Sequence, residues 1–270
     1  MGARAKVAFI GAGNLAWHLA PVLHEKAVEV VGVWGRRKSE YSWSLPYHID
    51  LQSLPGDLDA IFLAVPDDSI SEVARELEMH LSDEVHIIHG SGATGVDSLG
   101  SYFRRSGAFW PIRSLSIGQP IVDFKASAIG YFSPDPSLEK RLESWAKAIS
   151  PQHYRLDDSQ RANLHLASVI GQNFTNYLHH LSYQIAIDNG LPFSALKPLI
   201  ESTPLDDQDP ITRQTGPAAR KDAATIEKHL KLLREKPEVR EIYLALSEMI
   251  ASTRRTHSPS GPLYEEHREH

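Results

Sequence analysis

The fold is decided near the start of the chain, where residues 6–16 read KVAFIGAGNLA. Residues 6–10 are a short apolar run typical of a buried strand, and a glycine turn follows them directly. The apolar residues that come next recur at helical spacing, at Leu15, Leu19, Val22 and Leu23. The stretch therefore predicts a strand, a tight turn and an amphipathic helix.

The turn has the pattern G-x-G-x-x-A, formed by Gly11, Gly13 and Ala16. Gly11 permits the tight turn, Gly13 lets the backbone approach a pyrophosphate, and the small Ala16 lets the helix lie close to the strand. The N–H groups of the first helical turn then face the anion. The pattern predicts a dinucleotide site that also uses Asn14 and Leu15, and the alternative is a tight turn that binds nothing.

A basic segment follows the second predicted strand, residues 28–34, and reads GRRKS at residues 35–39. An NAD site uses an acidic residue at this point to hold the ribose 2′-hydroxyl, whereas an NADP site uses cations that bind the 2′-phosphate. Because no acidic residue lies between positions 30 and 38, we expect NADP, with Arg36, Arg37 and Ser39 as contacts. A solvated basic loop is the alternative.

Strands and helices continue to alternate beyond this segment. Apolar runs at residues 59–65 and 85–88 predict strands, and residues 153–156 predict a last short one. This rhythm is typical of parallel strands joined by right-handed crossovers, with ligands at the carboxyl ends of the strands. Further cofactor contacts are therefore expected directly after two of these strands, at Val65, Pro66, Ser91 and Gly92. Asp67 and Asp68 are expected to cap the next helix.

From residue 158 onward the pattern becomes helical throughout. Asp157 and Gln160 have the spacing of a capping box, and an apolar stripe then runs to Gly190. The sequence predicts an α/β fold, a doubly wound parallel Rossmann sheet, followed by an all-α domain. The predicted parts are an NADP-binding domain at 1–157, a helical domain for the substrate cleft and dimerisation at 158–256, and a loose tail at 257–270.

Composition excludes several classes of protein. The 270 residues are 41% hydrophobic and 23% charged, with a net charge of −6, so a non-specific grip on nucleic acid has no electrostatic support. Cysteine is absent, which excludes disulfides and thiolate metal sites. The first apolar run is too short for a membrane span, so we expect no membrane partner and a cytoplasmic protein. Fourteen histidines occur without an HExxH motif, and no metal site is predicted.

Several segments together resemble one family. They are residues 11–16 (GAGNLA), residues 89–93 (HGSGA), Leu164-His165 with Asn173, and residues 215–222 (TGPAARKD) with Thr225, His229 and Leu230. The chain resembles Rossmann-like proteins with a C-terminal helical domain of unknown function, relatives of pyrroline-5-carboxylate reductase and of deazaflavin-dependent NADP oxidoreductases. The resemblance covers nearly the whole chain. It implies the fold, NADP and a dimer formed through the helices, and it implies no substrate.

The chain departs from the pattern of that family at three places. Trp110-Pro111 stands where His-Pro is expected, and Arg220-Lys221-Asp222 stands where Arg-Gly-Asp is expected. An asparagine expected shortly after Thr203 is replaced by Asp206-Asp207. These departures weaken the expectation of catalytic turnover more than the expectation of cofactor binding.

Three residues are the candidates for chemistry. His165 is the first candidate for a proton donor, because imidazole titrates near neutral pH. Asn173, two turns further along the helix, could orient a substrate, and Arg220 could bind a carboxylate or phosphate. The alternatives are that His165 and Asn173 only bridge neighbouring helices and that Arg220 forms an ion pair.

Two functions remain open at this point. The first is an NADP(H)-dependent oxidoreductase that transfers hydride between the nicotinamide and a small carbonyl or imine compound. The second is a non-catalytic NADP-binding sensor or interaction protein, which Trp110 and Lys221 favour. In either case the expected partners are a small molecule and a second copy of the chain.

Overall fold

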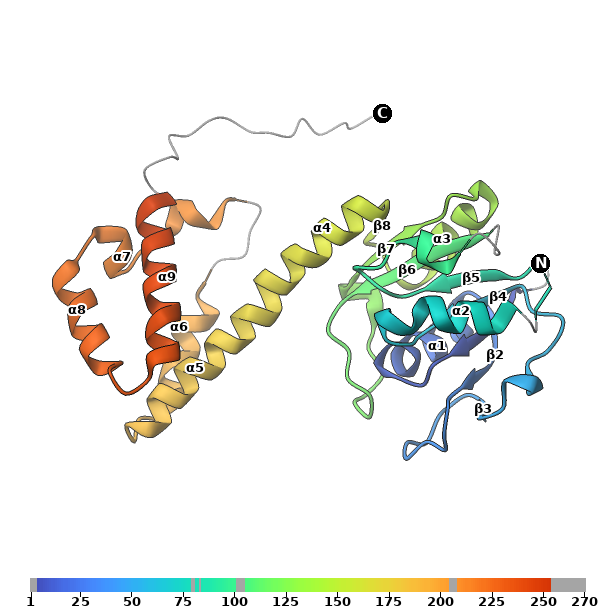
Figure 1. The fold of residues 1–270 in the computed structure, drawn as a ribbon, viewed down its shortest axis with the longest axis horizontal. Helices are drawn as coiled ribbons and strands as arrows, with labels where there is room; N and C mark the ends of the chain where they lie inside the picture. The colour runs from blue at the N-terminus through green and yellow to red at the C-terminus, as the bar shows by residue number, and fades with distance from the viewer. Residues whose placement is uncertain (1–3, 79–80, 83, 101–104, 204–207, 254–270) are drawn as a thin grey trace. The chain divides into compact units, whose positions relative to one another are not determined.

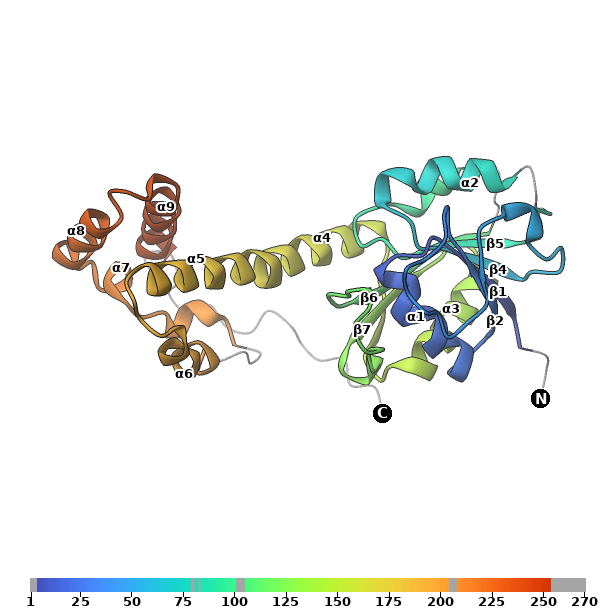
Figure 2. The ribbon, with the colours of Figure 1, turned by 90° about the horizontal axis from the view of Figure 1, so that it is seen from below.

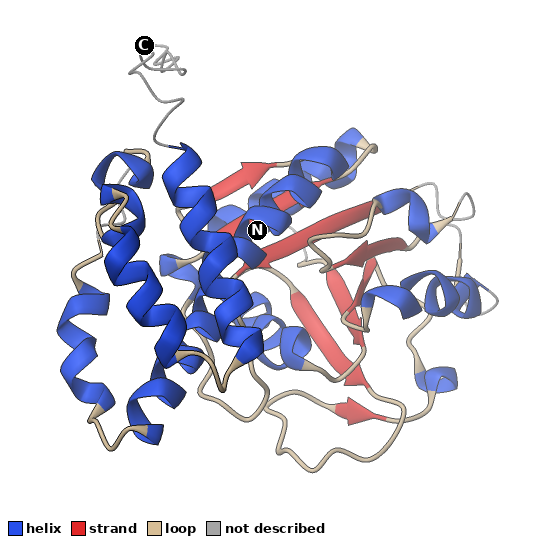
Figure 3. Cartoon of the chain, turned by 60° about the vertical axis from the view of Figure 1, so that its left-hand side comes forward, coloured by secondary structure: helices blue, strands red, loops and turns tan. Residues whose placement is uncertain are grey.

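The computed structural model describes residues 4–78, 81–82, 84–100, 105–203 and 208–253 (Figure 1). The chain forms two compact units, Met1–Thr175 and Asn176–His270. The first contains a sheet with helices, and the described part of the second is helical (Figure 3). This confirms the predicted fold class. The predicted tail at 257–270 and the acidic pair at 206–207 lie outside the described residues.

In the described residues of the first unit, the sheet has eight strands in the order β3-β2-β1-β4-β5-β6-β7-β8. The strands are β1 (Lys6–Ile10), β2 (Glu29–Trp34), β3 (Tyr47–His48), β4 (Ala60–Leu63), β5 (His86–His89), β6 (Ser106–Ile112), β7 (Ala128–Phe132) and β8 (His153–Arg155). Every neighbouring pair is parallel except β6 and β7, which are antiparallel. The strand order changes direction at β1 and β4, where doubly wound sheets bind ligands.

Both faces of the central strands are buried, which explains their unbroken apolar runs. On β1, Val7 and Phe9 belong to one core and Ala8 and Ile10 to the other. The ring of Phe9 stacks on Phe62 of β4 with 4.8 Å between centroids. The strand period of two thus divides the apolar residues between two cores.

Three helices of the first unit cover the sheet: α1 (Asn14–Lys26), α2 (Ile70–Glu78) and α3 (Pro136–Ile149). Figure 2 shows α2 on one face and α1 with α3 on the other. Asp135 caps α3 by accepting a hydrogen bond from the backbone N–H of Ser137 at 2.7 Å. Because helices cover both faces of the sheet, a ligand can reach it only at the strand ends and the loops that follow them.

One long helix leads out of the first unit. It consists of α4 (Asp158–Ser168), a π-helical segment η5 (Val169–Phe174) and α5 (Thr175–Asp188). Its N-terminus has the predicted capping box of Asp157 and Gln160. The change from alternating elements to helix therefore occurs where the periodicity predicts it. The compact units divide later, at Thr175, and the assignment of separate functions on either side of Asp157 stays a prediction.

The second unit contains the rest of α5 and several shorter helices. They are η6 (Phe193–Leu196), α6 (Lys197–Glu201), η7 (Pro210–Arg213), α7 (Pro217–Arg220), α8 (Ala223–Leu232) and α9 (Pro237–Thr253). His229 of α8 and Tyr243 of α9 are joined by a hydrogen bond of 2.8 Å between Nδ1 and the hydroxyl oxygen. Within the described residues, none of the helices combines the length and apolar character needed to cross a membrane.

Candidate functional site

The glycine turn after β1 has the backbone that the sequence pattern requires. Gly11 has a φ of +102°, and a Cβ atom there would lie 2.3 Å from the carbonyl oxygen of Ala64. At Gly13, by contrast, the nearest atom to a Cβ would be 3.8 Å away, so space is open above the turn. Gly13 is also the N-cap of α1 and supplies no side-chain cap. The first N–H groups of α1 are therefore left for another acceptor.

The two residues after Gly13 hold neighbouring loops. Asn14 Oδ1 accepts a hydrogen bond of 2.9 Å from the backbone N–H of Ile117, in the loop between β6 and β7. Leu15 packs so closely under Gly90 that a Cβ there would lie 2.0 Å from Leu15 Cδ2. Both side chains thus support the walls of the predicted cofactor site, and direct contact with a cofactor stays a prediction for each.

Two other candidates frame the turn from β4. Val65 is half-buried, and its Cγ1 would be 2.9 Å from a Cβ at Gly11. Pro66 precedes a short 3₁₀ turn, Asp67–Ser69, that leads into α2. The predicted capping role of Asp67 is wrong, because the N-cap of the turn is Pro66 and Asp67 lies inside its first turn. Its Oδ2 accepts a hydrogen bond of 2.7 Å from the hydroxyl of Ser91. A carboxylate that follows β4 is thus bonded to a residue that follows β5.

The basic segment after β2 is exposed. Arg36, Arg37 and Lys38 make no salt bridge to any other residue that the structure describes. Ser39 Oγ accepts hydrogen bonds from the backbone N–H of Tyr41 at 3.0 Å and from Trp43 Nε1 at 2.9 Å. The hydroxyl proton of Ser39 can therefore point away from both donors. Unpaired cations beside a hydroxyl donor are suited to a phosphate group.

The loop after β5 is built on a buried polar network. Ser91 Oγ lies 2.9 Å from Thr94 Oγ1 and accepts the backbone N–H groups of Ala93 and Thr94. With Asp67 also bound, the hydroxyl has no capacity left, so a cofactor contact at Ser91 would come from the backbone turn. Beneath it, His89 is fully buried, and burial lowers its pKa to about 4, with the charge of Arg161 as a second cause.

Arg161 is a residue that the sequence reasoning missed. Its side chain is 1% exposed, and Nε donates a hydrogen bond of 3.1 Å to the carbonyl oxygen of Ser91. Nη2 donates to Asp158 Oδ1 at 2.8 Å and to the carbonyl oxygen of Thr94. Arg161 thus fastens the start of α4 to the loop after β5. One available signal was its position four residues before His165, on the same face of a helix.

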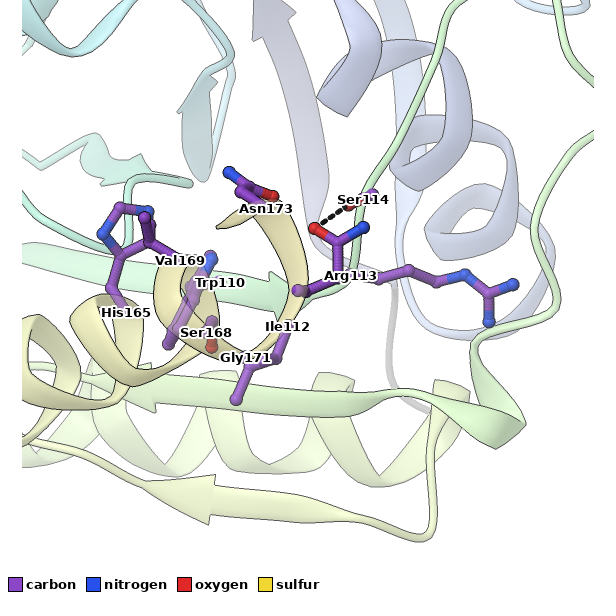
Figure 4. A pocket seen from close by; sticks show the side chains of 10 residues that line it. Trp110, Ile112, Arg113, Ser114, His165, Ser168, Val169, Gly171 and Asn173 are labelled. Carbon is purple, nitrogen blue, oxygen red and sulfur yellow. Dashed lines mark hydrogen bonds between the residues drawn. The ribbon is translucent and has the colours of Figure 1, made fainter. Parts of the chain in front are cut away.

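A cavity of about 320 Å³ opens between α4, η5 and the end of β6 (Figure 4). It is lined by Trp110, Ile112, Arg113, Ser114, His165, Ser168, Val169, Gly171, Gln172 and Asn173. The structure thus brings two of the three predicted catalytic residues, His165 and Asn173, to one cavity. Trp110 meets the His165 ring edge-on at 5.7 Å between centroids, so the family departure at position 110 is part of the cavity wall.

The π-helical turn shapes this cavity. An ideal α-helix would separate His165 and Asn173 by two turns, but η5 is wound more widely over Val169–Phe174. Gln172 Oε1 accepts a hydrogen bond of 3.2 Å from the hydroxyl of Ser114, which joins η5 to the end of β6. Arg113 points away from the other lining side chains in Figure 4, toward Ser127 Oγ at 3.1 Å. Wide helical turns of this kind are frequent at functional sites.

Gly92 joins the loop after β5 to this cavity. A Cβ atom there would lie 2.6 Å from His165 Cδ2 and 2.8 Å from Trp110 Cε2. Only a glycine leaves room for both rings at this point. The predicted cofactor contact at position 92 is therefore adjacent to the predicted proton donor.

Arg220, the third catalytic candidate, lies in the second unit at the end of α7 and is exposed. An ion pair with Asp222, one form of the alternative to a binding role, does not occur among the described residues. Instead, Asp222 caps α8 and accepts hydrogen bonds from the backbone N–H and the hydroxyl of Thr225, at 3.0 and 2.7 Å. These bonds lower the pKa of Asp222, with a smaller contribution from the charge of Arg220.

The backbone at Lys221 explains why a glycine is expected at this position in the family pattern. Its φ is +58°, a left-handed conformation that no other non-glycine residue adopts among those described. Glycine suits this position for conformational reasons. The glycine expected here is therefore accounted for by the backbone, and its replacement by lysine says nothing against turnover. Within the described residues, no three His, Asp or Glu side chains are grouped as metal ligands.

The sequence was compared with models of protein families and with curated proteins. The sequence model for "Domain of unknown function (DUF2520)" matches residues 129–250, from the start of β7 to α9. None of the curated proteins matches the sequence. The domain thus includes the last two strands of the sheet as well as helices.

Solved structures resemble nearly the whole chain. A "putative NADP oxidoreductase" from Bacteroides fragilis is 29% identical, with a TM-score of 0.83, and the match covers 92% of this chain and 98% of that one. The pyrroline carboxylate reductase of Plasmodium falciparum with NADP bound is 15% identical, with a TM-score of 0.56 and coverage of 93% and 100%. An imine reductase of Myxococcus stipitatus in complex with NAD⁺ is 15% identical, with a TM-score of 0.56 and coverage of 93% and 94%. The last two show the fold alone.

Proposed function

Because residues 129–250 match the DUF2520 model and nearly the whole chain resembles a putative NADP oxidoreductase, we propose that it is an NADP(H)-dependent oxidoreductase. The substrate class is a small carbonyl or imine compound. The observation that carries the proposal is the position of the cavity: His165 and Asn173 line it, and His165 lies against Gly92 in the loop that follows a central parallel strand. Ligands of doubly wound sheets bind at such strand ends.

The residues of the first unit fit the cofactor. The uncapped N-terminus of α1 and the open space at Gly13 suit a pyrophosphate, since a Cβ at Gly13 would meet nothing closer than 3.8 Å. Arg36 and Arg37 suit the 2′-phosphate, because they are exposed cations with no described salt-bridge partner. Val65, Pro66 and Gly92 continue the site along the strand ends. When bound, NADPH supplies a hydride from its nicotinamide.

The chain's own residues would supply the proton and the positioning. In this proposal an imidazole N–H of His165 donates the proton that a carbonyl oxygen or imine nitrogen takes up on reduction. The amide of Asn173, on the same cavity, orients the substrate by hydrogen bonds. Trp110 covers the wall beside His165 and limits the access of water. Arg220 belongs to the second unit and is a separate candidate, for binding a substrate carboxylate or a cofactor phosphate.

The first test concerns the cofactor. Titration calorimetry of the full chain should give a lower Kd for NADPH than for NADH. Combined replacement Arg36→Ala and Arg37→Ala should weaken NADPH binding about tenfold or more, because charge-assisted hydrogen bonds contribute about 1.5–3 kcal/mol each. Lys140→Ala, an exposed cation on α3, is the control. Equal or tighter binding of NADH by the wild-type protein would exclude the NADP assignment.

The second test concerns turnover. Loss of the nicotinamide absorbance of NADPH is followed against a panel of keto acids, cyclic imines and a deazaflavin. Oxidation with one class identifies the substrate, and His165→Ala should then lower kcat by about a hundredfold or more. Tight NADPH binding with no oxidation across the panel would favour the alternative function, a non-catalytic NADP-binding sensor. The observation that favours this alternative is Trp110 on the cavity wall.

We also propose that the protein is a homodimer formed through its helices. Leu166, Ile170 and Phe174 lie on one side of α4 and η5, and each is more than half exposed. Contiguous apolar surface of this kind marks an interaction site. A location in the cytoplasm stays a prediction.

A further inference from the structure

Tyr47 of β3 reaches back to the basic segment after β2. Its hydroxyl donates a hydrogen bond of 2.7 Å to the carbonyl oxygen of Arg37. On its way the side chain crosses Gly35, where a Cβ atom would lie 1.9 Å from the Tyr47 hydroxyl oxygen. The contact can form only because residue 35 is glycine. The side chain thus spans the segment from its start at Gly35 to the backbone of Arg37.

The neighbouring aromatic residue holds the other end of the segment. The Trp43 ring stacks on Tyr47 with 5.6 Å between centroids and an interplanar angle of 26°. Its Nε1 donates to Ser39 Oγ, which also accepts the backbone N–H of Tyr41. Residues 37 and 39 are therefore both bonded to this aromatic pair, and the stacked rings link the two attachments.

The side chains of the segment are held much less than its backbone. Arg36 and Arg37 extend from it as exposed groups without a described salt-bridge partner. Burial raises the pKa of Tyr47, with the charge of Arg37 opposing the shift, so the hydroxyl keeps its proton near neutral pH and remains a donor. A fixed backbone that presents unpaired cations is the arrangement expected of a preorganised anion site.

We propose that Tyr47 is a positioning residue that sets the preference for a 2′-phosphorylated dinucleotide by holding the backbone that carries Arg36, Arg37 and Ser39. This inference rests on the proposed NADP function. The segment is ordered before the phosphate arrives, so little conformational entropy is lost on binding. A cofactor with a free 2′-hydroxyl gains little binding energy from the cations, so its Kd should not depend on Tyr47.

The test compares Tyr47→Phe with Tyr41→Phe. Tyr47→Phe removes the donor to Arg37 and keeps the ring that stacks on Trp43. Tyr41→Phe removes the hydroxyl of an exposed tyrosine two residues beyond the basic segment and is the matched control. We expect Tyr47→Phe to raise the Kd for NADPH about threefold to tenfold, the range for one lost hydrogen bond, and to change the Kd for NADH less than twofold. Tyr41→Phe should leave both values unchanged.

A second variant disrupts the contact between Tyr47 and Arg37 by a change at Gly35 instead of at Tyr47. Gly35→Ala places a Cβ where the Tyr47 hydroxyl lies, so it should raise the Kd for NADPH as Tyr47→Phe does. The two changes disrupt one contact, and the double variant should therefore show a smaller effect than the product of the single effects.

Trypsin provides a readout that needs no nucleotide, because it cleaves after Arg36, Arg37 and Lys38. The Tyr47→Phe variant should be cut faster in this segment than the wild-type protein, with Tyr41→Phe cut at the wild-type rate. Faster cleavage with an unchanged NADPH-to-NADH ratio of Kd values would overturn the role in selectivity and leave the proposed function intact. A wild-type protein without preference for NADPH would overturn both.

Discussion

Nε of Arg161 donates a hydrogen bond of 3.1 Å to the carbonyl oxygen of Ser91. This bond joins the first turn of α4 to the loop after β5, and both partners are buried. One turn later α4 presents His165, and one residue later the loop presents Gly92, where a Cβ would touch the His165 ring. Arg161 thus holds together the two elements that position His165: helix α4, which carries it, and the loop after β5, which lies against its ring.

Replacement of Arg161 by alanine should lower the free energy of unfolding by roughly 2–4 kcal/mol. The change removes the donor from two backbone carbonyl groups and from Asp158 Oδ1. The Asp158 side chain is 36% exposed and still accepts the backbone N–H of Val96, so most of the loss comes from the two carbonyl groups and from the packing of the buried arginine. Urea unfolding of the full chain measures the change. Arg155→Ala is the control, because its salt bridge to Glu139 involves an arginine that is 54% exposed and should contribute at most about 1 kcal/mol. Similar losses in the two variants would contradict the role given to Arg161.

The buried imidazole of His89 should make stability depend on pH. Its pKa falls from 6.5 to about 4 in the folded protein, so the unfolded chain binds more protons between these values. This contribution to stability is present above pH 6.5 and is lost as the pH falls toward 4. Between pH 7 and pH 5 the loss should be about 2 kcal/mol.

Urea unfolding at pH 7 and pH 5 tests the assignment to His89. His89→Gln keeps an acceptor for the backbone N–H of Ser91, which donates to His89 Nδ1 at 3.2 Å, and removes the titration. The variant should therefore lose about 2 kcal/mol less than the wild-type protein between the two pH values. His86, whose pKa is also lowered by burial, contributes equally to both proteins. An equal loss in the variant would show that another group is responsible.

The elements that could be predicted from sequence are those with a local signal. The first strand, turn and helix follow from residues 6–16, and the capping box of Asp157 and Gln160 follows from its spacing. Strands β3, β6 and β7 were not predicted. The two residues of β3 are too few for a period, and β6 contains Pro111 and begins with three small residues. Their pairing with distant strands decides their structure, and sequence patterns do not show distant pairing.

The candidate site was predictable only in part for the same reason. Gly11 and Gly13 belong to a local motif, whereas the partners of Asp67 and Arg161 come from distant elements. Sequence position alone predicts a capping role for Asp67, whereas its carboxylate accepts a hydrogen bond from the hydroxyl of Ser91, which is distant in sequence and close in space. The contact between Tyr47 and Arg37 likewise depends on where β3 returns to the sheet, although only ten residues separate the two.

Gly13→Ala should separate cofactor binding from folding. A Cβ at Gly13 would meet no protein atom closer than 3.8 Å, so the melting temperature should change little. The same atom would occupy the space predicted for the pyrophosphate, and NADPH binding should weaken by about tenfold or more, a loss of about 1.4 kcal/mol or more. Calorimetric titration and thermal unfolding measure the two effects.

Gly11→Ala is the comparison for Gly13→Ala. Its Cβ would lie 2.3 Å from the Ala64 carbonyl oxygen and its φ is +102°, so this variant should lose stability and NADPH binding together. Unaltered NADPH affinity in Gly13→Ala would place the pyrophosphate elsewhere.

Phe174→Asp should convert the proposed dimer to a monomer. Phe174 is 58% exposed on η5, and a carboxylate in an apolar interface would be desolvated without a partner. Light scattering should give a mass of about twice 30.1 kDa for the wild-type protein and the single-chain mass for the variant. Ile49→Asp, at a side chain that is 53% exposed on another surface, should remain a dimer. A monomeric wild-type protein would exclude the proposed assembly.

Lys221→Gly should raise the free energy of unfolding by about 0.5–1 kcal/mol. The left-handed φ of +58° costs a residue with a Cβ about 1–2 kcal/mol, and the greater freedom of glycine in the unfolded chain offsets part of this gain. Lys221→Ala keeps the Cβ and should change stability little, whereas the β-branched Lys221→Val should lower it by about 1 kcal/mol or more. Urea unfolding of the three variants gives the order glycine, alanine, valine if the backbone decides. Equal stabilisation by alanine and glycine would instead assign the effect to the lysine side chain, and Lys221 would again count as a departure that bears on function.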